Sequence, residues 1–211
     1  MKSRGKLTQA SIVATALDML DTHGDKAFSM RKLAAALDVD PMAIYHHHAN
    51  KSALFQAVMQ AMLEKCDVPE PSGNWQKDVR DLCQGLRGLA QKHPGAFQIY
   101  EFYEDWVPAE HRLHEAFHAA LLGGGFSQRR AVQAVRVILT YTESFAVDEI
   151  SGWLDPEDRA DLAQSLAQGP YPHMIALLDE IGTSDADADF AFGLDVIIQG
   201  LEAQLRQSTL S

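Results

Sequence analysis

The spacing of apolar residues restricts the fold of this chain more than any other feature of its sequence. Apolar residues recur at intervals of three and four along nearly every segment, and the sequence shows no convincing alternation by two. Intervals of three and four place side chains on one face of an α-helix, because a helix completes a turn every 3.6 residues. The sequence therefore predicts an all-α fold.

Capping residues and glycines mark where these helices begin and end. Thr8, Ser29, Asp40 and Asn50 each precede an apolar-periodic run, and their side chains are of the kinds that cap helix N-termini. Gly24 is expected to end the first helix, since glycine tolerates the left-handed conformation that follows a helix. The expected helices cover residues 9–23, 29–37, 41–47, 50–65, 75–92, 97–103, 108–122, 128–153, 173–181 and 190–206.

Charge divides the chain into two parts. The 211 residues carry a formal net charge of −11. Residues 1–66 hold eight Lys and Arg residues against six Asp and Glu residues, so this part carries +2 and the remainder carries −13. Two prolines between Cys66 and Gly73 interrupt the helical pattern at the junction. Because an acidic surface repels phosphate, residues 1–66 are expected to face nucleic acid and residues 67–211 to form a second domain.

The composition disfavours several classes of protein. The chain is 46% hydrophobic, which suffices for a core, but no stretch reaches the roughly 20 apolar residues that cross a bilayer. The charged N-terminus lacks the apolar segment of a signal peptide, and the two cysteines lack metal-ligand spacing. No nucleophile elbow or phosphate-binding loop occurs. We therefore expect a soluble cytoplasmic protein with no cofactor, no membrane partner and no enzymatic activity.

Residues 29–48 have the layout of a helix-turn-helix. Ser29 to Leu37 forms a bracing helix, Asp38 to Asp40 a tight turn, and Pro41 to His47 a short second helix. A short helix of this kind can enter the DNA major groove, which is about 12 Å wide, while the preceding helix braces it across the backbone. The sequence therefore predicts a DNA-reading unit in this segment.

Leu7 to Met62 resembles the DNA-binding domain of the TetR family of repressors. The residues that carry the resemblance are Ser29-Met30-Arg31, Leu33-Ala34, Leu37, Val39, Ala43-Ile44-Tyr45-His46, Lys51 and Leu54. The chain departs from the family's pattern at Asp38, where many relatives have glycine, but aspartate tolerates the left-handed conformation better than most residues. The resemblance implies an N-terminal three-helix helix-turn-helix domain, joined by a linking helix to a larger helical domain for ligand binding and dimerisation.

The resemblance also implies which residues contact double-stranded DNA. Arg31 can reach a base edge or a phosphate, and Tyr45 can donate to a phosphate oxygen. Tyr45 could instead fill the core of the domain, and Lys32 could simply be solvated. The run of His46, His47 and His48 is expected to contact DNA or solvent. The candidate DNA-binding residues are Lys6, Ser29, Arg31, Lys32, Pro41, Met42, Ala43, Tyr45, His46 and Lys51.

For the second domain the resemblance implies a homodimer, held by a four-helix bundle across a two-fold axis. Residues 128–153 and 190–206 are the candidate helices, and an acidic, mobile connection is expected at residues 155–172. The short second helix of the helix-turn-helix is the recognition helix. A two-fold dimer presents its two recognition helices to half-sites about one DNA turn apart, so a palindromic operator is expected. The candidate interface residues are Val135, Leu139, Leu194, Ile197, Ile198, Leu201 and Leu205.

A pocket for a small-molecule effector is expected among aromatic residues of the second domain, although aromatic residues at helical spacing can equally be ordinary core. An acidic domain rich in aromatic residues is compatible with a cationic or planar ligand. The candidate pocket residues are Phe97, Tyr100, Tyr103, Trp106, Phe117, Tyr141, Glu143, Phe145, His173 and Met174.

Three alternatives stay open. His111, His114 and His118 could present imidazoles to a metal ion, or could belong to a solvated face with Glu110 and Glu115. The chain could be a sensor or interaction module that has lost DNA binding, although its candidate DNA-binding residues are intact. It could also activate transcription, because activation and repression both begin with operator binding.

Overall fold

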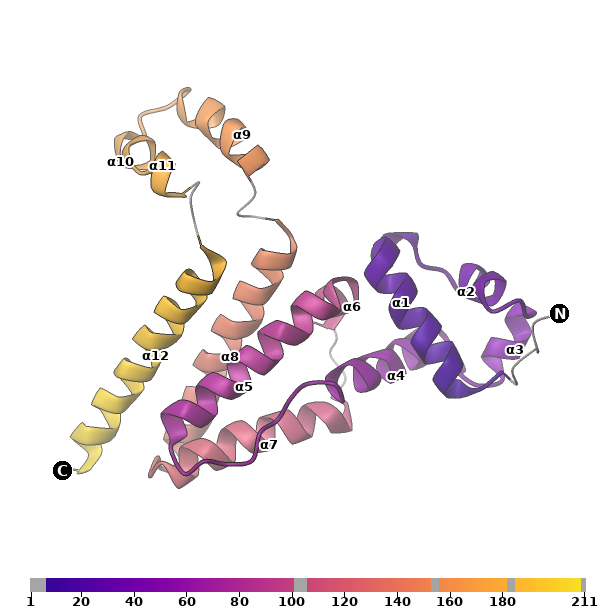
Figure 1. Cartoon of the computed structure of the whole chain (residues 1–211), viewed down its shortest axis with the longest axis horizontal. Coiled ribbons are helices and arrows are strands. Elements are labelled where there is room, and N and C mark those ends of the chain that lie inside the picture. The colour runs from indigo at the N-terminus through magenta and orange to yellow at the C-terminus, as the bar shows by residue number, and fades with distance from the viewer. Residues whose placement is uncertain (1–6, 101–105, 153–155, 182–184, 210–211) are drawn as a thin grey trace. The chain divides into compact units, whose positions relative to one another are not determined.

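The computed structural model describes residues 7–100, 106–152, 156–181 and 185–209, apart from the side chains of residues 156–159 and 208–209. Every regular element in these residues is a helix, which confirms the predicted all-α fold (Figure 1). None of these helices combines the length and the apolar character needed to cross a membrane. The helices are α1 (Gln9–Ala27), α2 (Met30–Ala36), α3 (Pro41–Tyr45), α4 (Lys51–Leu63), α5 (Trp75–Lys92), α6 (Pro94–Tyr100), α7 (Pro108–Gly123), α8 (Gln128–Ile150), α9 (Pro156–Leu166), α10 (Pro172–Ala176), α11 (Leu178–Ile181) and α12 (Ala186–Thr209).

Contacts between helices divide the chain into two compact units, Met1–Ala120 and Leu121–Ser211. The predicted domain boundary lies inside the first unit, because α6 packs closely against α1. Asp21 of α1 fixes the start of α6: its Oδ1 accepts from the Ala96 amide at 3.2 Å, and its Oδ2 lies 2.7 Å from His93 Nδ1. The boundary at residue 66, which is predicted from charge, does not coincide with a gap in helix packing. It stays a prediction about function.

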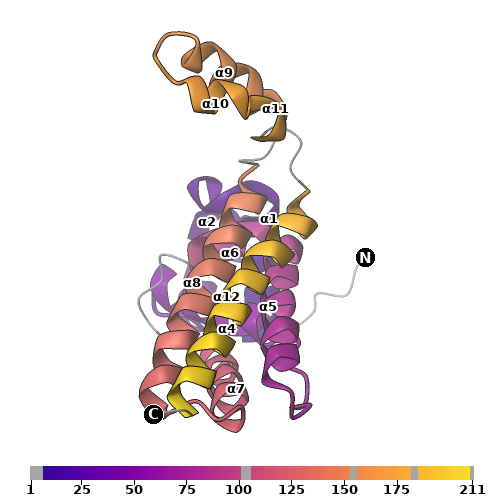
Figure 2. The ribbon, with the colours of Figure 1, turned by 90° about the vertical axis from the view of Figure 1, so that its left-hand side faces the viewer.

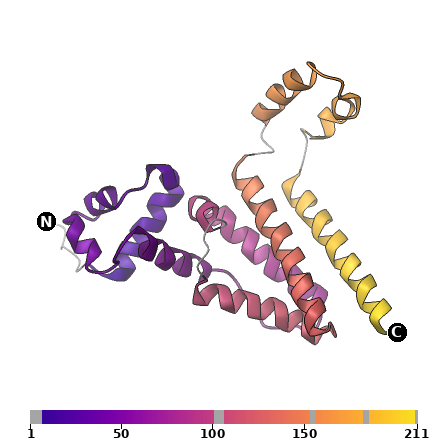
Figure 3. The same ribbon diagram turned by 180° about the vertical axis from the view of Figure 1, so that it is seen from behind.

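The first four helices enclose an apolar core, and α2 and α3 lie next to one another beside α1 (Figures 1 and 3). All four predicted N-caps are present, because each cap side chain accepts from a backbone amide two or three residues on, at 2.8 to 3.2 Å. Gly24 breaks the helical geometry with a φ of 70°, but α1 resumes and ends at Ala27. Burying a large aliphatic side chain stabilises the fold by about 1.5–3 kcal/mol. The core side chains include Ile12, Ala16, Leu20, Leu33, Ile44, Leu54, Val58 and Met62.

In the second unit α8 and α12 run side by side and antiparallel (Figure 2). Phe190, Leu194 and Ile198 of α12 are each at most 3% exposed. The Tyr141 hydroxyl of α8 donates to Phe190 O at 2.9 Å. A Cβ added at Gly193 would overlap the Tyr141 ring, so a larger residue there would displace the Tyr141 side chain.

The acidic connection expected at residues 155–172 is wrong over most of its length, because α9 forms there. Apolar residues at 162, 163 and 166 recur at helical spacing between the acidic residues, and Leu166 is buried. Proline at position 156 suits a first helical turn, where acidic residues are also favoured by the helix dipole. The single helix expected at residues 173–181 is divided between α10 and α11, which pack on α9.

Candidate nucleic-acid interface and ligand region

The turn between α2 and α3 has the geometry that a helix-turn-helix requires. The Val39 amide donates to Ala34 O at 3.0 Å as the chain reverses. Asp38 has a φ of 52°, the left-handed conformation expected of it. The fully buried Ile44 then holds α3 against the core. α3 is shorter than predicted and ends at Tyr45.

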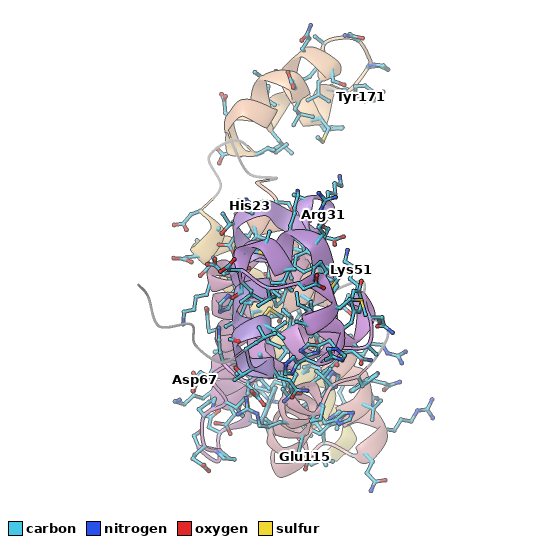
Figure 4. The ribbon with its side chains drawn as sticks, turned by 90° about the vertical axis from the view of Figure 1, so that its right-hand side faces the viewer. His23, Arg31, Lys51, Asp67, Glu115 and Tyr171 are labelled. Carbon is cyan, nitrogen blue, oxygen red and sulfur yellow. The ribbon has the colours of Figure 1, made fainter. Side chains whose placement is uncertain are left out.

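The surface of the DNA-reading unit carries apolar side chains from α3, and basic side chains are exposed on α2 and α4. Met42 is 61% exposed and Tyr45 39% exposed, so Tyr45 does not fill the core. Figure 4 shows Arg31 and Lys51 toward the same edge of the unit. Lys6 lies outside the described residues. Of the other candidates, Arg31, Lys32, His46 and Lys51 are exposed, and Ser29, Pro41 and Ala43 are half-buried.

Two of the basic candidates are oriented by neighbouring groups. Lys32 Nζ donates to Ala27 O at 2.7 Å. Lys51 Nζ lies 3.0 Å from Asp25 Oδ1 and 4.7 Å from the centre of the Phe55 ring. Because an ammonium group has three N–H donors, both side chains keep donors that a phosphate can use.

His48 lies inside the domain, whereas the sequence favoured contact with DNA or solvent for this residue. It is 7% exposed, and its Nε2 has no hydrogen-bond partner among the described residues. Its amide donates to Ile44 O at 2.9 Å, which continues the helical turn past the end of α3. Burial first, and the neighbouring His47 second, lower the pKa of His48. The buried ring is therefore neutral at pH 7.

The candidate pocket residues of α6 and α7 are buried together. Phe97 and Phe117 are fully buried, and the Tyr100 ring is centred 5.6 Å from that of Phe97. The Tyr100 hydroxyl donates to Glu110 Oε1 at 3.2 Å. Burial raises the pKa of Glu110, although hydrogen bonds from Val107 and Tyr100 oppose this shift. These residues combine aromatic side chains with one half-buried carboxyl group, which are residue types that occur in pockets for aromatic ligands.

Trp106 is 56% exposed and lies over the histidines of α7. Its ring is centred 5.5 Å from that of His111 and 4.6 Å from that of His114. Burial, followed by the neighbouring His118 and His111, lowers the pKa of His114. His118 Nδ1 lies 2.7 Å from His114 O, which occupies that nitrogen. The described residues include no group of three or more His, Cys, Asp or Glu side chains that could hold a metal ion. Tyr103 lies outside the described residues.

The remaining pocket candidates belong to the second unit. The rings of Tyr141 and Phe145 are centred 5.6 and 5.2 Å from that of Phe190, so both hold α8 against α12. Both rings thus pack between the two helices. Of the other candidates, Glu143 is half-buried, and His173 and Met174 are exposed.

Four of the predicted interface residues require correction, because they are buried within a single protomer. Val135, Leu139, Leu194 and Ile198 are 3%, 6%, 1% and 3% exposed. A partner cannot reach side chains that already face the protomer's own core. Ile197, Leu201 and Leu205 are half-buried and stay candidates. The exposed apolar side chains of α12 are Phe192 and Val196, at 72% and 55%.

Sequence reasoning did not find Arg112 and Asp78, which line a cavity of about 310 Å³ with residues of the segment 68–71, α5 and α7. Asp78 is 6% exposed and accepts hydrogen bonds from the amide and hydroxyl of Ser72, at 2.9 and 2.5 Å. Its position on the buried face of α5 could have revealed it. No sequence signal identifies Arg112, because its partners are backbone carbonyls of another helix.

Comparison with known proteins gives matches over nearly the whole chain. Residues 12–58 match the family model for bacterial regulatory proteins of the tetR family, and residues 68–205 match that for the tetracyclin repressor-like C-terminal domain. Tetracycline repressor protein class G of Vibrio anguillarum is 29% identical over 211 residues, which cover 98% of both chains.

Two solved structures of ActR, a TetR family protein of Streptomyces coelicolor, are similar in fold as well. The apo structure has a TM-score of 0.79 and 30% identity, covering 95% of this chain and 99% of that chain. The complex with actinorhodin has a TM-score of 0.83 and 29% identity, with the same coverage of 95% and 99%.

Proposed function

The chain belongs to the tetR family of bacterial regulatory proteins, and from this premise we infer that it is a ligand-responsive, DNA-binding transcriptional repressor. It binds a palindromic operator as a homodimer and leaves the operator when a small molecule occupies the second domain. Its role is regulatory rather than catalytic, and it acts in the cytoplasm.

The observation that carries this proposal is the well-formed α2–turn–α3 segment with basic residues along one edge. Arg31 of α2 and Lys51 of α4 lie toward this edge (Figure 4), and α3 carries the exposed side chains of Met42 and Tyr45. Met42 and Ala43 offer apolar contacts of the kind that read thymine methyl groups, while Tyr45, His46 and Lys51 donate to phosphates. The −13 charge of residues 67–211 leaves this edge as the part that attracts DNA.

An aromatic compound is the effector that the structure supports best. Phe97 and Phe117 are buried aromatic side chains, and the Tyr100 ring packs near Phe97 while its hydroxyl donates to the carboxyl group of Glu110. One similar protein is named as a tetracycline repressor, and another has been solved with actinorhodin. The effector releases DNA only if it binds more tightly to a dimer whose recognition helices no longer match successive grooves.

The first test is to incubate the purified protein with fragmented genomic DNA and to sequence what it retains at several salt concentrations. We expect a retained palindrome, binding that weakens steeply with salt, and weaker retention by Arg31→Ala and Tyr45→Phe. Arg129→Ala, at an exposed arginine of α8, is the matched control and should bind as the wild type does. If nothing is retained above background, the chain is not a DNA-binding repressor.

The second test addresses the effector. Tetracycline and actinorhodin are the first compounds to add, because similar proteins are associated with them. A compound that raises the melting temperature should also release the retained palindrome. Stabilisation by a compound that leaves operator affinity unchanged would contradict ligand-responsive release.

A further inference from the structure

The C-terminal end of α4 is held by a side chain from α7. The last carbonyls of a helix lack partners within the helix and carry the negative end of its dipole. Arg112 of α7 places Nη2 at 3.4 Å from each of three carbonyl oxygens at this end, those of Leu63, Glu64 and Cys66. A guanidinium group supplies both the donors and the positive charge that this helix end favours.

The N-terminal end of α7 is held by a side chain from α4 in return. The Ala109 amide lies in the first turn of α7, where amides also lack partners within the helix. It donates to Gln60 Oε1 of α4 at 2.9 Å. Figures 1 and 3 show the C-terminal end of α4 beside the N-terminal end of α7. Each helix thus places a polar side chain against backbone groups at the end of the other, and we call Gln60 and Arg112 together the α4–α7 tie.

The other end of α4 is fixed to the DNA-reading unit. Leu54 and Val58 are fully buried in the core that α4 shares with α1, and the Asn50 side chain caps the first turn of α4. α4 therefore connects α3, the recognition helix, to the α4–α7 tie through this core. A movement of α7 reaches α3 along this path if the tie holds.

We propose that Arg112 is the positioning residue that couples α7 to α4 and, through α4, sets the position of the recognition helix. The α4–α7 tie makes the first turns of α7 and the end of α4 move together. Its polar contacts depend on direction as well as distance, unlike a purely apolar contact between the two helices. The inference deepens the proposed function, because it names the contact that passes effector binding to DNA.

The direct test measures the distance between the DNA-reading unit and α7 within one protomer, and it needs neither DNA nor effector. Spin labels are placed at Ala36→Cys and Glu115→Cys, both exposed, and labelled chains are diluted with unlabelled ones. Cys66 and Cys83 are buried, and burial raises the pKa of Cys66 to about 11, so these thiols label slowly. We expect a narrow distance distribution for the labelled wild type.

Arg112→Gln should broaden or shift this distribution. Arg112→Lys keeps the charge but loses the planar guanidinium group, so its distribution should lie between those of the wild type and Arg112→Gln. Arg129→Gln is the matched control. Melting curves show that each variant is folded before its distances are compared. A distribution unchanged in both Arg112→Gln and the double variant Arg112→Gln/Gln60→Leu would overturn the proposal.

A second readout uses the operator retained in the genomic selection. Wild type should discriminate against operators whose half-site spacing differs by one base pair. Arg112→Gln should lose roughly fivefold or more of this discrimination, the lower range of coupling between sites. A merely structural role would weaken binding to both spacings equally and would also contradict the proposal. If no operator is retained by the wild type, the proposed function fails, while the distance measurement still decides the role of Arg112.

Discussion

The side chain of His48 is a titratable group buried within the DNA-reading unit, and burial lowers its pKa. A histidine whose pKa is lower in the folded state than in the unfolded state binds fewer protons when the protein is folded. The free energy of unfolding therefore gains nothing from this residue well above the unfolded value of about 6.5. Below that value the unfolded state takes up protons first, so the free energy of unfolding falls as the pH falls.

We expect His48→Leu to make this fall shallower below about pH 6.5, because leucine removes the buried proton site. Urea unfolding at a series of pH values measures the slope. His114→Leu should act in the same direction, since burial also lowers the pKa of His114. His23→Gln, at an exposed histidine, serves as the control. A His48→Leu slope equal to that of the wild type would contradict a buried neutral ring.

Lys51 has two partners within the protein and one proposed partner on DNA. Its ammonium group is shared between Asp25 and the Phe55 ring, and the exposed ion pair contributes about 0–1 kcal/mol to stability. Lys51→Met should lower the salt dependence of operator binding by roughly two in the slope of log K against log salt, from one phosphate contact in each protomer. Titrations at several salt concentrations give this slope.

Asp25→Asn is the matched variant for Lys51, because it removes the same ion pair but leaves the ammonium group. It should preserve the salt slope and leave operator binding equal to or tighter than that of the wild type. If Asp25→Asn weakens binding as much as Lys51→Met does, the ion pair itself supports the DNA-reading unit and Lys51 does not contact phosphate.

At the scale of helices, two glycines test how closely α6 approaches α1. A Cβ added at Gly95 of α6 would overlap the Leu20 carbonyl of α1, whereas a Cβ at Gly88 of α5 meets nothing within 4 Å. We expect Gly95→Ala to destabilise the protein by about 1–3 kcal/mol through overpacking. Gly88→Ala should stabilise it by about 0.5–1 kcal/mol, since alanine is the better helix former. Chemical denaturation measures both, and equal shifts would contradict the close approach.

At the scale of the whole molecule, α12 carries both exposed and buried large apolar residues. Phe192 and Val196 are exposed, while Leu194 faces the protomer's own core. If the exposed pair contacts the partner, Phe192→Lys and Val196→Lys should give folded monomers in analytical ultracentrifugation. Leu194→Ala should lose about 2–5 kcal/mol of stability but stay a dimer. Met42→Lys, at an exposed residue of the DNA-reading unit, is the control for added charge.

A dimer that persists in both lysine variants would place the interface elsewhere. Ile197, Leu201 and Leu205, which are half-buried in the protomer, would then be the next residues to change. Loss of folded protein in the lysine variants, seen in melting curves, would instead show that Phe192 and Val196 stabilise the protomer.

The sequence by itself determined the all-α character, most of the helices, four of their N-caps and the helix-turn-helix. Thr8, Ser29, Asp40 and Asn50 cap helices where they were expected to, and Asp38 adopts the left-handed conformation that the turn needs. These features depend on hydrogen bonds and sterics among residues a few positions apart, and such interactions can be read from neighbours in the sequence. In α9 the apolar spacing at residues 162, 163 and 166 is short and lies among acidic residues, so composition alone indicates a connection there.

Only the tertiary structure decided which side chains each helix buries. Leu194 and Phe192 are both apolar residues of α12, yet one faces the protomer core and the other the surface. The His48 side chain is buried, and the Arg112 side chain contacts a carbonyl at the end of α4. Both placements also depend on how the helices pack. Burial and such contacts depend on residues far apart in the sequence, whose approach is set by the packing of whole helices.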